Sequence, residues 1–277
     1  MAFVTVGTEN ATNIDLYYED HGAGQPVVLI HGFPLDGRSW EKQMPALLGA
    51  GYQVIAYDRR GFGKSSQPTT GYDYDTFAAD LNTLLTTLHL SDVILVGFSM
   101  GTGEVTRYIG TYGTGSISKT VLAGPIPPFL LQAADNPGGV PQSVFDGFKD
   151  AIGADRPAFL TGFFDNFYNT KDLLGTRVSE DKIRSDFIVA SQASAIGTLL
   201  CVDSWLTDFR GDLPKFDVPT LVIQGDADQI LPIDVTSRHL PGLIANSEFV
   251  EIAGGPHNIA WTHAEEFNAA LMAFLAK

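Results

Sequence analysis

Cysteine is almost absent from this chain of 277 residues, in which Cys201 is the only one. A single cysteine excludes an internal disulfide and a thiolate cluster for zinc or iron–sulfur. The six histidines are scattered along the chain, and it has no Cys-x-x-Cys-His motif for haem attachment. We therefore expect chemistry that uses neither a metal nor any other cofactor.

Positive charge is also scarce, because 17 basic residues face 32 acidic ones and the formal net charge is −15 at pH 7. Such a field repels phosphate backbones and anionic lipid surfaces, so we expect neither nucleic acid nor a membrane as a partner. No stretch approaches the apolar length needed to cross a bilayer, and the first residues lack the features of a signal peptide. These features favour a cytoplasmic protein.

Apolar residues make up 44% of the chain, which is enough for the core of one large α/β domain with an insertion. Short apolar runs at 26–30, 52–57, 93–96 and 119–123 alternate with helical patterns such as the one at 75–90. This alternation predicts parallel strands joined by helical crossovers. Residues 3–6 and 13–19 predict a β-hairpin that forms one edge of the sheet.

The pattern changes after Gly124, where helical segments rich in aromatic residues follow one another without a convincing strand. We interpret residues 126–214 as an inserted helical cap and residues 1–125 with 215–277 as the core domain. Most cap aromatics should pack among themselves while a minority line a pocket, and the sequence does not sort them. Strands are predicted again at 218–223 and 249–252. Thr262 and Glu265 have capping-box spacing ahead of a final helix.

The pentapeptide Gly97-Phe98-Ser99-Met100-Gly101 lies directly between the apolar run at 93–96 and a helical stretch. This strand, turn and helix setting is typical of a nucleophile elbow, in which glycines permit a sharp turn and the serine hydroxyl projects from it. The alternative is a glycine-rich turn with an idle serine. Because a serine hydroxyl is a poor nucleophile, the interpretation depends on a base and an acid elsewhere.

Asp228 and His257 both follow later predicted strands, and ligands of open α/β sheets bind beyond the carboxyl ends of the strands. The chain order serine, acid, histidine is the one expected for a nucleophile elbow. Asp226 competes with Asp228, which we prefer because it ends the turn and has room to reach the next loop. His257 would then take the Ser99 proton while Asp228 orients its imidazole.

The other histidines have plainer roles. His31 sits in a glycine-bearing turn, where a structural hydrogen bond is the simpler role. His239 and His263 lie in predicted surface helices and should be solvated, and His21 and His89 lie in turn-like stretches.

Acyl transfer also needs donors for an oxyanion. One is the backbone N–H of Met100, which follows the nucleophile. The second should come from His31-Gly32-Phe33-Pro34, and because proline has no N–H the best-placed donor there is Phe33. Residues 61–65 superficially suggest a phosphate loop, but that motif needs a glycine where the chain has Asp58, so we assign this turn no ligand.

Taken together, these segments resemble the α/β-hydrolase superfamily, and more closely its cofactor-free bacterial haloperoxidases of the bromoperoxidase and chloroperoxidase type, also called perhydrolases. The segments that carry the resemblance are 31–34, 58–65, 97–101, 225–228 and 256–257. The resemblance implies the α/β-hydrolase fold, a mostly parallel sheet of eight strands with helices on both faces and a helical cap. It also implies a homo-oligomer, which nothing in the sequence itself establishes.

The activity implied by this resemblance is perhydrolysis. An acid or ester acylates Ser99, hydrogen peroxide releases a peracid, and the peracid oxidises halide in solution. Pro34 is a candidate for selecting peroxide over water, against the alternative that it only rigidifies its loop. A carboxylesterase, an aryl esterase or a γ-lactamase is the competing enzyme, and a ligand receptor on a hydrolase scaffold the competing non-enzyme. Dehalogenation or epoxide opening needs a carboxylate nucleophile at the elbow, so Ser99 argues against it.

Overall fold

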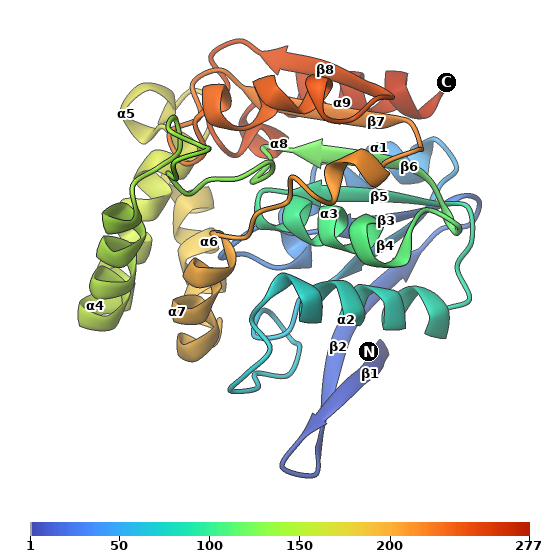
Figure 1. Cartoon of the computed structure of the whole chain (residues 1–277), viewed down its shortest axis with the longest axis horizontal. Helices are drawn as coiled ribbons and strands as arrows, with labels where there is room; N and C mark the ends of the chain where they lie inside the picture. The colour runs from blue at the N-terminus through green and yellow to red at the C-terminus, as the bar shows by residue number, and fades with distance from the viewer. Residues whose placement is uncertain (1) are drawn as a thin grey trace.

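The computed structural model describes residues 2–277, whose strands form one eight-stranded sheet in the order β1-β2-β4-β3-β5-β6-β7-β8. The pairs β1/β2 and β2/β4 are antiparallel, and all pairs from β4 to β8 are parallel. The strands are β1 (Ala2–Glu9), β2 (Thr12–His21), β3 (Pro26–Ile30), β4 (Gln53–Tyr57), β5 (Val93–Phe98), β6 (Ile117–Ala123), β7 (Thr220–Gly225) and β8 (Ser247–Ile252). The predicted α/β-hydrolase architecture is confirmed, with the β1–β2 hairpin at one edge (Figure 1).

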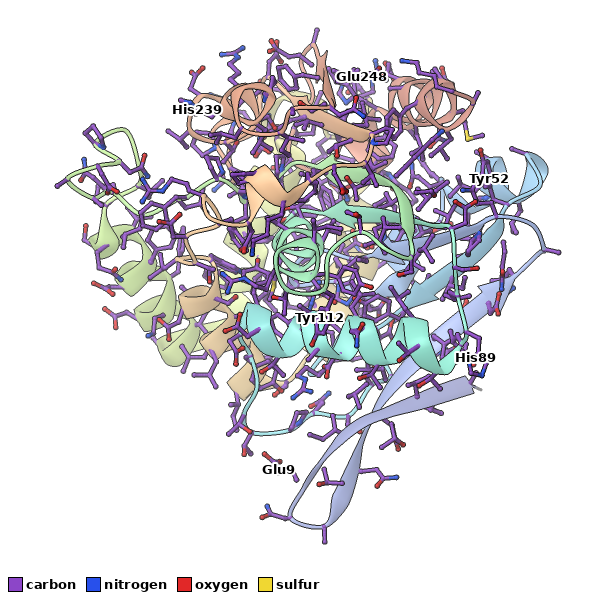
Figure 2. All side chains as sticks on the ribbon, turned by 45° about the vertical axis from the view of Figure 1, so that its right-hand side comes forward. Glu9, Tyr52, His89, Tyr112, His239 and Glu248 are labelled. Atoms are coloured by element: carbon purple, nitrogen blue, oxygen red, sulfur yellow. The ribbon has the colours of Figure 1, made fainter. Side chains whose placement is uncertain are left out.

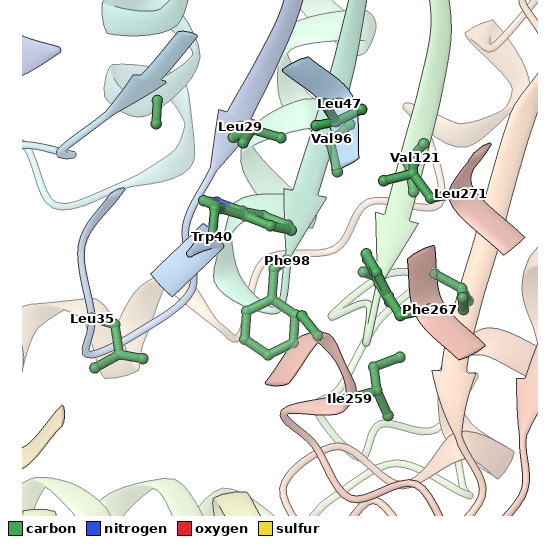
Figure 3. Close-up of a cluster of buried hydrophobic side chains, with 14 of the residues drawn as sticks. Leu29, Leu35, Trp40, Leu47, Val96, Phe98, Val121, Ile259, Phe267 and Leu271 are labelled. Atoms are coloured by element: carbon green, nitrogen blue, oxygen red, sulfur yellow. The ribbon is translucent and has the colours of Figure 1, made fainter. Parts of the chain in front are cut away.

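Helices cover both faces of the sheet because successive side chains of each buried strand point to opposite faces. Val27 and Leu29 of β3 join the apolar cluster under α1 and α9, whereas Val28 and Ile30 join the cluster under α2 and α3. These four helices are α1 (Met44–Gly49), α2 (Tyr74–Thr87), α3 (Met100–Tyr112) and α9 (Ala264–Leu275). Figure 3 shows the first cluster, in which Phe98 lies at the end of β5 among side chains from several elements.

The chain between β6 and β7 carries four further helices: α4 (Gln142–Tyr168), α5 (Thr170–Leu173), α6 (Glu180–Ser191) and α7 (Ala195–Ser204). The long helix α4 is broken at Asp155, whose φ and ψ are not helical, and Pro157 follows. Figure 1 shows α4, α6 and α7 gathered at one end of the sheet, and the arrowheads of β6 and β8 point toward that end. These helices therefore lie where the carboxyl ends of the parallel strands meet.

The remaining elements are a short helix, α8 (Ile259–Thr262), and four 3₁₀ turns: η1 (Gly37–Trp40), η2 (Leu213–Lys215), η3 (Ile233–Val235) and η4 (Ser237–Gly242). The predicted capping box is wrong. Helix α9 has His263 as its N-cap residue without a side-chain cap, and the Thr262 hydroxyl instead donates to the Asn258 carbonyl inside α8.

Within residues 2–277, no single helix is long and apolar enough to cross a membrane. Helices α6 and α7 pass the same criterion only as a pair, and they are bent by 96° relative to each other.

Candidate active site

Ser99 lies in the sharp turn between β5 and α3, with φ 52° and ψ −121°. A non-glycine residue at positive φ is strained, and such strain is characteristic of a nucleophile elbow. The flanking glycines are required by close approach, since a Cβ on Gly97 would lie 2.6 Å from the Gly101 carbonyl oxygen and one on Gly101 would lie 2.4 Å from that of Ile30. The Ser99 amide donates to the Ala123 carbonyl at 2.8 Å, which fixes the turn to β6.

The loops after β7 and β8 bring Asp228 and His257 to this serine. His257 Nε2 is 2.8 Å from Ser99 Oγ, and His257 Nδ1 is 2.7 Å from Asp228 Oδ2. Because the carboxylate can only accept here, Nδ1 carries the proton and Nε2 is free to accept from the serine hydroxyl. Ser99 is 6% exposed, His257 1% and Asp228 9%, so bulk water barely reaches this chain of hydrogen bonds.

Asp226 has a different place. Its side chain is exposed and accepts a hydrogen bond from the Gly254 amide at 2.7 Å, so it ties the two loops together from outside. Of the two acids that compete in the sequence, only Asp228 contacts His257.

Asp228 is held by groups besides His257. Its Oδ1 accepts from the amides of Ile230 and Leu231 at 2.8 and 2.9 Å, and its Oδ2 accepts from Gln224 Nε2 at 2.9 Å. Sequence reasoning missed Gln224, although a signal was present: it is a fully buried amide at the end of an otherwise apolar strand, four residues before the acid.

The two predicted oxyanion donors lie on either side of Ser99. Met100 is the first residue of α3, and the loop that carries Phe33 runs so close that a Cβ on Gly32 would lie 2.8 Å from Ser99 Cβ. Among the turn and cap hydrogen bonds of residues 2–277, neither the Phe33 nor the Met100 amide donates to a protein acceptor. Both N–H groups therefore remain available for a ligand. Pro34 follows Phe33 through a cis peptide bond.

His31 makes structural hydrogen bonds that hold the loop carrying Phe33, as the sequence predicts. Its Nδ1 lies 2.9 Å from the Gly32 carbonyl oxygen, and its Nε2 accepts from the Arg59 amide at 2.9 Å. Burial, and secondarily the Arg59 charge, lower the pKa of His31 to about 3, so its ring is neutral. Three other histidines are exposed: His21, His89 and His239. Figure 2 shows His89 and His239 at the outside of the molecule.

The expectation of a solvated His263 is wrong, because the residue is 4% exposed and its Nδ1 lies 3.0 Å from the Thr262 hydroxyl. The first residues of α9 are half-buried or exposed, but its N-cap residue His263 is buried, and burial lowers the pKa of His263.

A buried ion pair lies on the same side as His31. Arg59 Nε donates to Glu104 at 2.7 Å, the Tyr57 hydroxyl donates to the same carboxylate, and neither charged side chain is more than 1% exposed. Burial raises the pKa of Glu104, and the Arg59 charge opposes that shift. Arg59 also donates to the His31 carbonyl at 2.9 Å, which links the ion pair to the loop that carries Phe33.

Asp58, which directly precedes Arg59 in the chain, is also buried. It accepts from the amides of Gly37 and Lys64 at 2.9 and 2.8 Å, and burial together with the nearby Asp36 raises its pKa to about 6. A Cβ on Gly63 would lie 2.1 Å from Asp58 Oδ2. Gly63 thus permits a tight turn around this carboxylate, whereas a Cβ on Gly61 would meet the Tyr72 ring.

Aromatic side chains of α4, together with Trp205 directly after α7, border both halves of the site. Phe33 packs edge-on against Trp205 and Phe163, with ring centroids 4.9 and 5.6 Å away, whereas Phe167 packs against His257 at 5.3 Å. The surroundings of Ser99 are therefore largely apolar. A polar cavity of about 110 Å³ lies elsewhere, between residues 35–41 and α6, and neither Ser99 nor His257 lines it.

Residues 25–264 match the family described as the alpha/beta hydrolase fold. The sheet order, the elbow and the hydrogen-bonded serine, histidine and aspartate agree with this match. The chain belongs to the α/β-hydrolase family.

Three relatives place it more narrowly. A Synechocystis protein, provisionally assigned as a non-heme chloroperoxidase, is 62% identical over 99% of this chain and 100% of its own length. The crystal structure of bromoperoxidase from Bacillus anthracis is 50% identical with a TM-score of 0.96, covering 100% of this chain and 99% of that one. A bifunctional esterase/perhydrolase from Acinetobacter calcoaceticus is 32% identical over 95% of this chain and 96% of its own length. Within the family, the chain is a member of the non-heme haloperoxidase group.

Proposed function

We propose that this protein is a serine-dependent perhydrolase, which makes a peracid from a carboxylic acid or ester and hydrogen peroxide without a cofactor. The observation that carries the proposal is the continuous chain of hydrogen bonds from Ser99 Oγ through His257 to Asp228, at 2.8 and 2.7 Å. This arrangement supplies the general base that a serine hydroxyl needs. The names of the relatives support a haloperoxidase with esterase activity.

In the first half-reaction, His257 takes the proton of Ser99 as Oγ attacks the acyl carbon. The tetrahedral oxyanion would accept hydrogen bonds from the Phe33 and Met100 amides. His257 then returns the proton to the leaving alcohol or water, and the acyl group stays on Ser99. Asp228 holds the imidazole in the required tautomer and stabilises the imidazolium.

In the second half-reaction, His257 takes a proton from hydrogen peroxide, and the resulting hydroperoxide attacks the acyl carbon. The bond to Ser99 Oγ breaks, the serine regains its proton from His257, and the peracid leaves. Peracid oxidises bromide or chloride in solution, so the protein needs no halide site. We also propose that residues 126–214 act as the cap that holds the acyl group, because Trp205, directly after α7, borders Phe33 and Phe167 of α4 borders His257.

Pro34 is the proposed selector of peroxide over water. It follows the donor Phe33, and its ring restricts φ to near −65°, which would hold a loop carbonyl where it can accept the extra O–H of peroxide. The alternative is that Pro34 only rigidifies the loop.

The proposal is tested with a short aryl ester and hydrogen peroxide, measuring acid and peracid together. Wild-type protein should turn over repeatedly, and Ser99→Ala should lose at least about 10³-fold in kcat for both products. Pro34→Leu should lower the ratio of peracid to acid while ester hydrolysis persists. An unchanged ratio would remove Pro34 as the selector.

Two results would replace the proposal. If wild-type protein hydrolyses esters or lactams but forms no peracid, the esterase or γ-lactamase function takes its place. If the protein binds a small molecule tightly but shows no repeated turnover, it is a receptor on this scaffold.

A further inference from the structure

The C-terminal end of α4 contacts both loops that carry the acid and the base. Asn169 follows the last residue of α4 and donates from Nδ2 to the Ala227 carbonyl at 2.7 Å, one residue before Asp228. Phe167 accepts from the amide of Asn258 at 3.0 Å, one residue after His257. Two loops that follow different strands are thus fixed to three consecutive residues of one helix end.

Asn169 has the left-handed conformation, with φ 48° and ψ 53°, which asparagine tolerates better than most residues. Its side chain makes no second polar contact, because within residues 2–277 its buried Oδ1 has no hydrogen-bond partner. Leaving a buried acceptor unpaired is unfavourable, typically by about 1–3 kcal/mol. The one bond that Asn169 Nδ2 makes to Ala227 is therefore the main polar role of this side chain.

Asn258 is bound to the same helix end by its side chain. Its Nδ2 donates to the Tyr168 hydroxyl at 3.0 Å, while its Oδ1 accepts from the Trp261 amide at 3.3 Å and caps α8. Tyr168 in turn donates to Asp186, and Lys182 Nζ donates to that carboxylate at 2.8 Å. The helix end is consequently anchored to α6 on its outer side.

We propose that Asn169 and Asn258 are positioning residues, which through the end of α4 set the distance between Asp228 and His257. The inference rests on the function proposed above. Neutral amides suit this task because they fix the two loops without adding a charge beside the Asp228–His257 pair, whose attraction must rise when the imidazolium forms. Helix α4 would then belong to the catalytic scaffold as well as to the cap.

The test compares Asn169→Gly with Asn10→Gly. Glycine keeps the left-handed backbone at both positions, so the Asn169 variant loses only the amide. Asn10 is a matched control, since it also has positive φ, at 49°, and lies in the turn between β1 and β2, directly after Glu9, which Figure 2 shows near the tip of the hairpin. Tyr168→Phe, which removes the acceptor for Asn258, provides a second variant if Asn169→Gly folds poorly.

Two readouts are used. The first is ester hydrolysis, for which Asn169→Gly and Tyr168→Phe should lower kcat about 3- to 10-fold with little change in KM, as loss of one hydrogen bond implies. The second is the low-field proton resonance of the His257 Nδ1–H bonded to Asp228, which should shift or broaden in both variants and stay unchanged in Asn10→Gly.

The inference is overturned if the resonance and kcat of both α4 variants match wild type, or if KM alone changes. Failure of the proposed function looks different, because the resonance does not depend on turnover. In that case Ser99→Ala would retain full activity, or wild type would have none, while the resonance still responded to Asn169→Gly.

Discussion

The two sides of Ser99 are built from different chemistry. On the side of the oxyanion loop, the supports are ionisable and deeply buried: His31, Asp58 and the Arg59–Glu104 ion pair. On the side of the acid and base, the groups that hold the loops are chiefly neutral amides: Gln224, Asn169 at the end of α4 and Asn258 directly after His257.

This difference follows from what each side must do during the reaction. In the proposed mechanism the oxyanion loop presents backbone donors that keep their charge state, so its supports need only be rigid, and a buried ion pair that also bonds Tyr57 and the His31 carbonyl is rigid. In the proposed mechanism, His257 gains and loses a proton in each cycle. A second ionisable group beside it would add a further charge next to the Asp228–His257 pair, and neutral amides avoid this.

Removal of the acid should give the largest effect on activity. Asp228→Asn is expected to lower kcat by about 10⁴-fold, because an amide at this position favours the wrong imidazole tautomer. Asp226→Asn is the matched control and should stay within about threefold of wild type, since within residues 2–277 the one hydrogen bond of the Asp226 side chain is the one it accepts from the Gly254 amide. Steady-state ester hydrolysis measures both variants. Equal losses would show that the two acids do not differ in function.

Breaking the ion pair on the opposite side should affect stability most. Glu104→Gln leaves the Arg59 charge buried without its counter-charge, so the free energy of unfolding should fall by about 3–5 kcal/mol. Glu266→Gln removes a carboxylate whose pair with Arg177 is 42–45% exposed, and it should cost less than about 1 kcal/mol. Urea unfolding at pH 7 compares them. A loss below 1 kcal/mol in Glu104→Gln would mean that the pair does not stabilise the loop.

The ionisable side should also carry a pH dependence of stability. The pKa of Asp58 is raised to about 6 from a usual value of 3.8, so the folded state binds this proton more tightly than the unfolded state. The contribution of Asp58 to stability is therefore greatest below pH 4 and is lost as pH rises to about 6, by roughly 3 kcal/mol. His31 has the opposite sign, because its lowered pKa destabilises the fold as pH falls from about 6.5 toward 3.

Asp58→Asn separates these contributions. The difference in unfolding free energy between wild type and this variant should become less favourable to wild type as pH rises from 4 to 7. Denaturant titrations at several pH values in this range measure the difference. A constant difference would show that Asp58 titrates near its usual pKa.

The sheet and the elbow could be predicted from the sequence because their signals are local. An apolar run followed directly by Gly97 and Ser99 indicates the end of a strand and the start of a helix. The apolar spacing after Asp75 likewise indicates a helix and the face that it packs on the sheet. The prediction of a capping box was wrong because a second local signal competes for the same side chain. Thr262 and Glu265 have the right spacing, but the short helix α8 uses the Thr262 hydroxyl first.

The supports of the site could not be predicted in the same way. Asn169 meets Ala227 only after α4 has folded over the sheet, and no spacing in the chain records that contact. The burial of His263 likewise depends on which elements pack against α9. Gln224 lies between these cases, because an amide in a buried strand signals a polar partner but does not say which one.

Gln224 allows the smallest and most specific test of the comparison. Its Nε2 donates to Asp228, and its Oε1 accepts from the hydroxyls of Thr236 and Ser237 at 3.1 and 2.5 Å, so the support is a neutral chain two bonds long. Gln224→Met preserves volume but removes the donor to Asp228 and to the Leu231 carbonyl, which Nε2 also contacts at 2.6 Å. We expect kcat to fall about 10-fold, mainly through loss of the hydrogen bond to the charged Asp228. Thr236→Val removes one of the two outer bonds, together with the Thr236 bond to the Pro232 carbonyl, and leaves the Ser237 hydroxyl on Gln224 Oε1, so its loss should be about twofold. Ester hydrolysis by both variants measures the two losses in kcat, and unfolding is followed in parallel. A larger loss in Thr236→Val than in Gln224→Met would contradict a support that acts through the amide of Gln224.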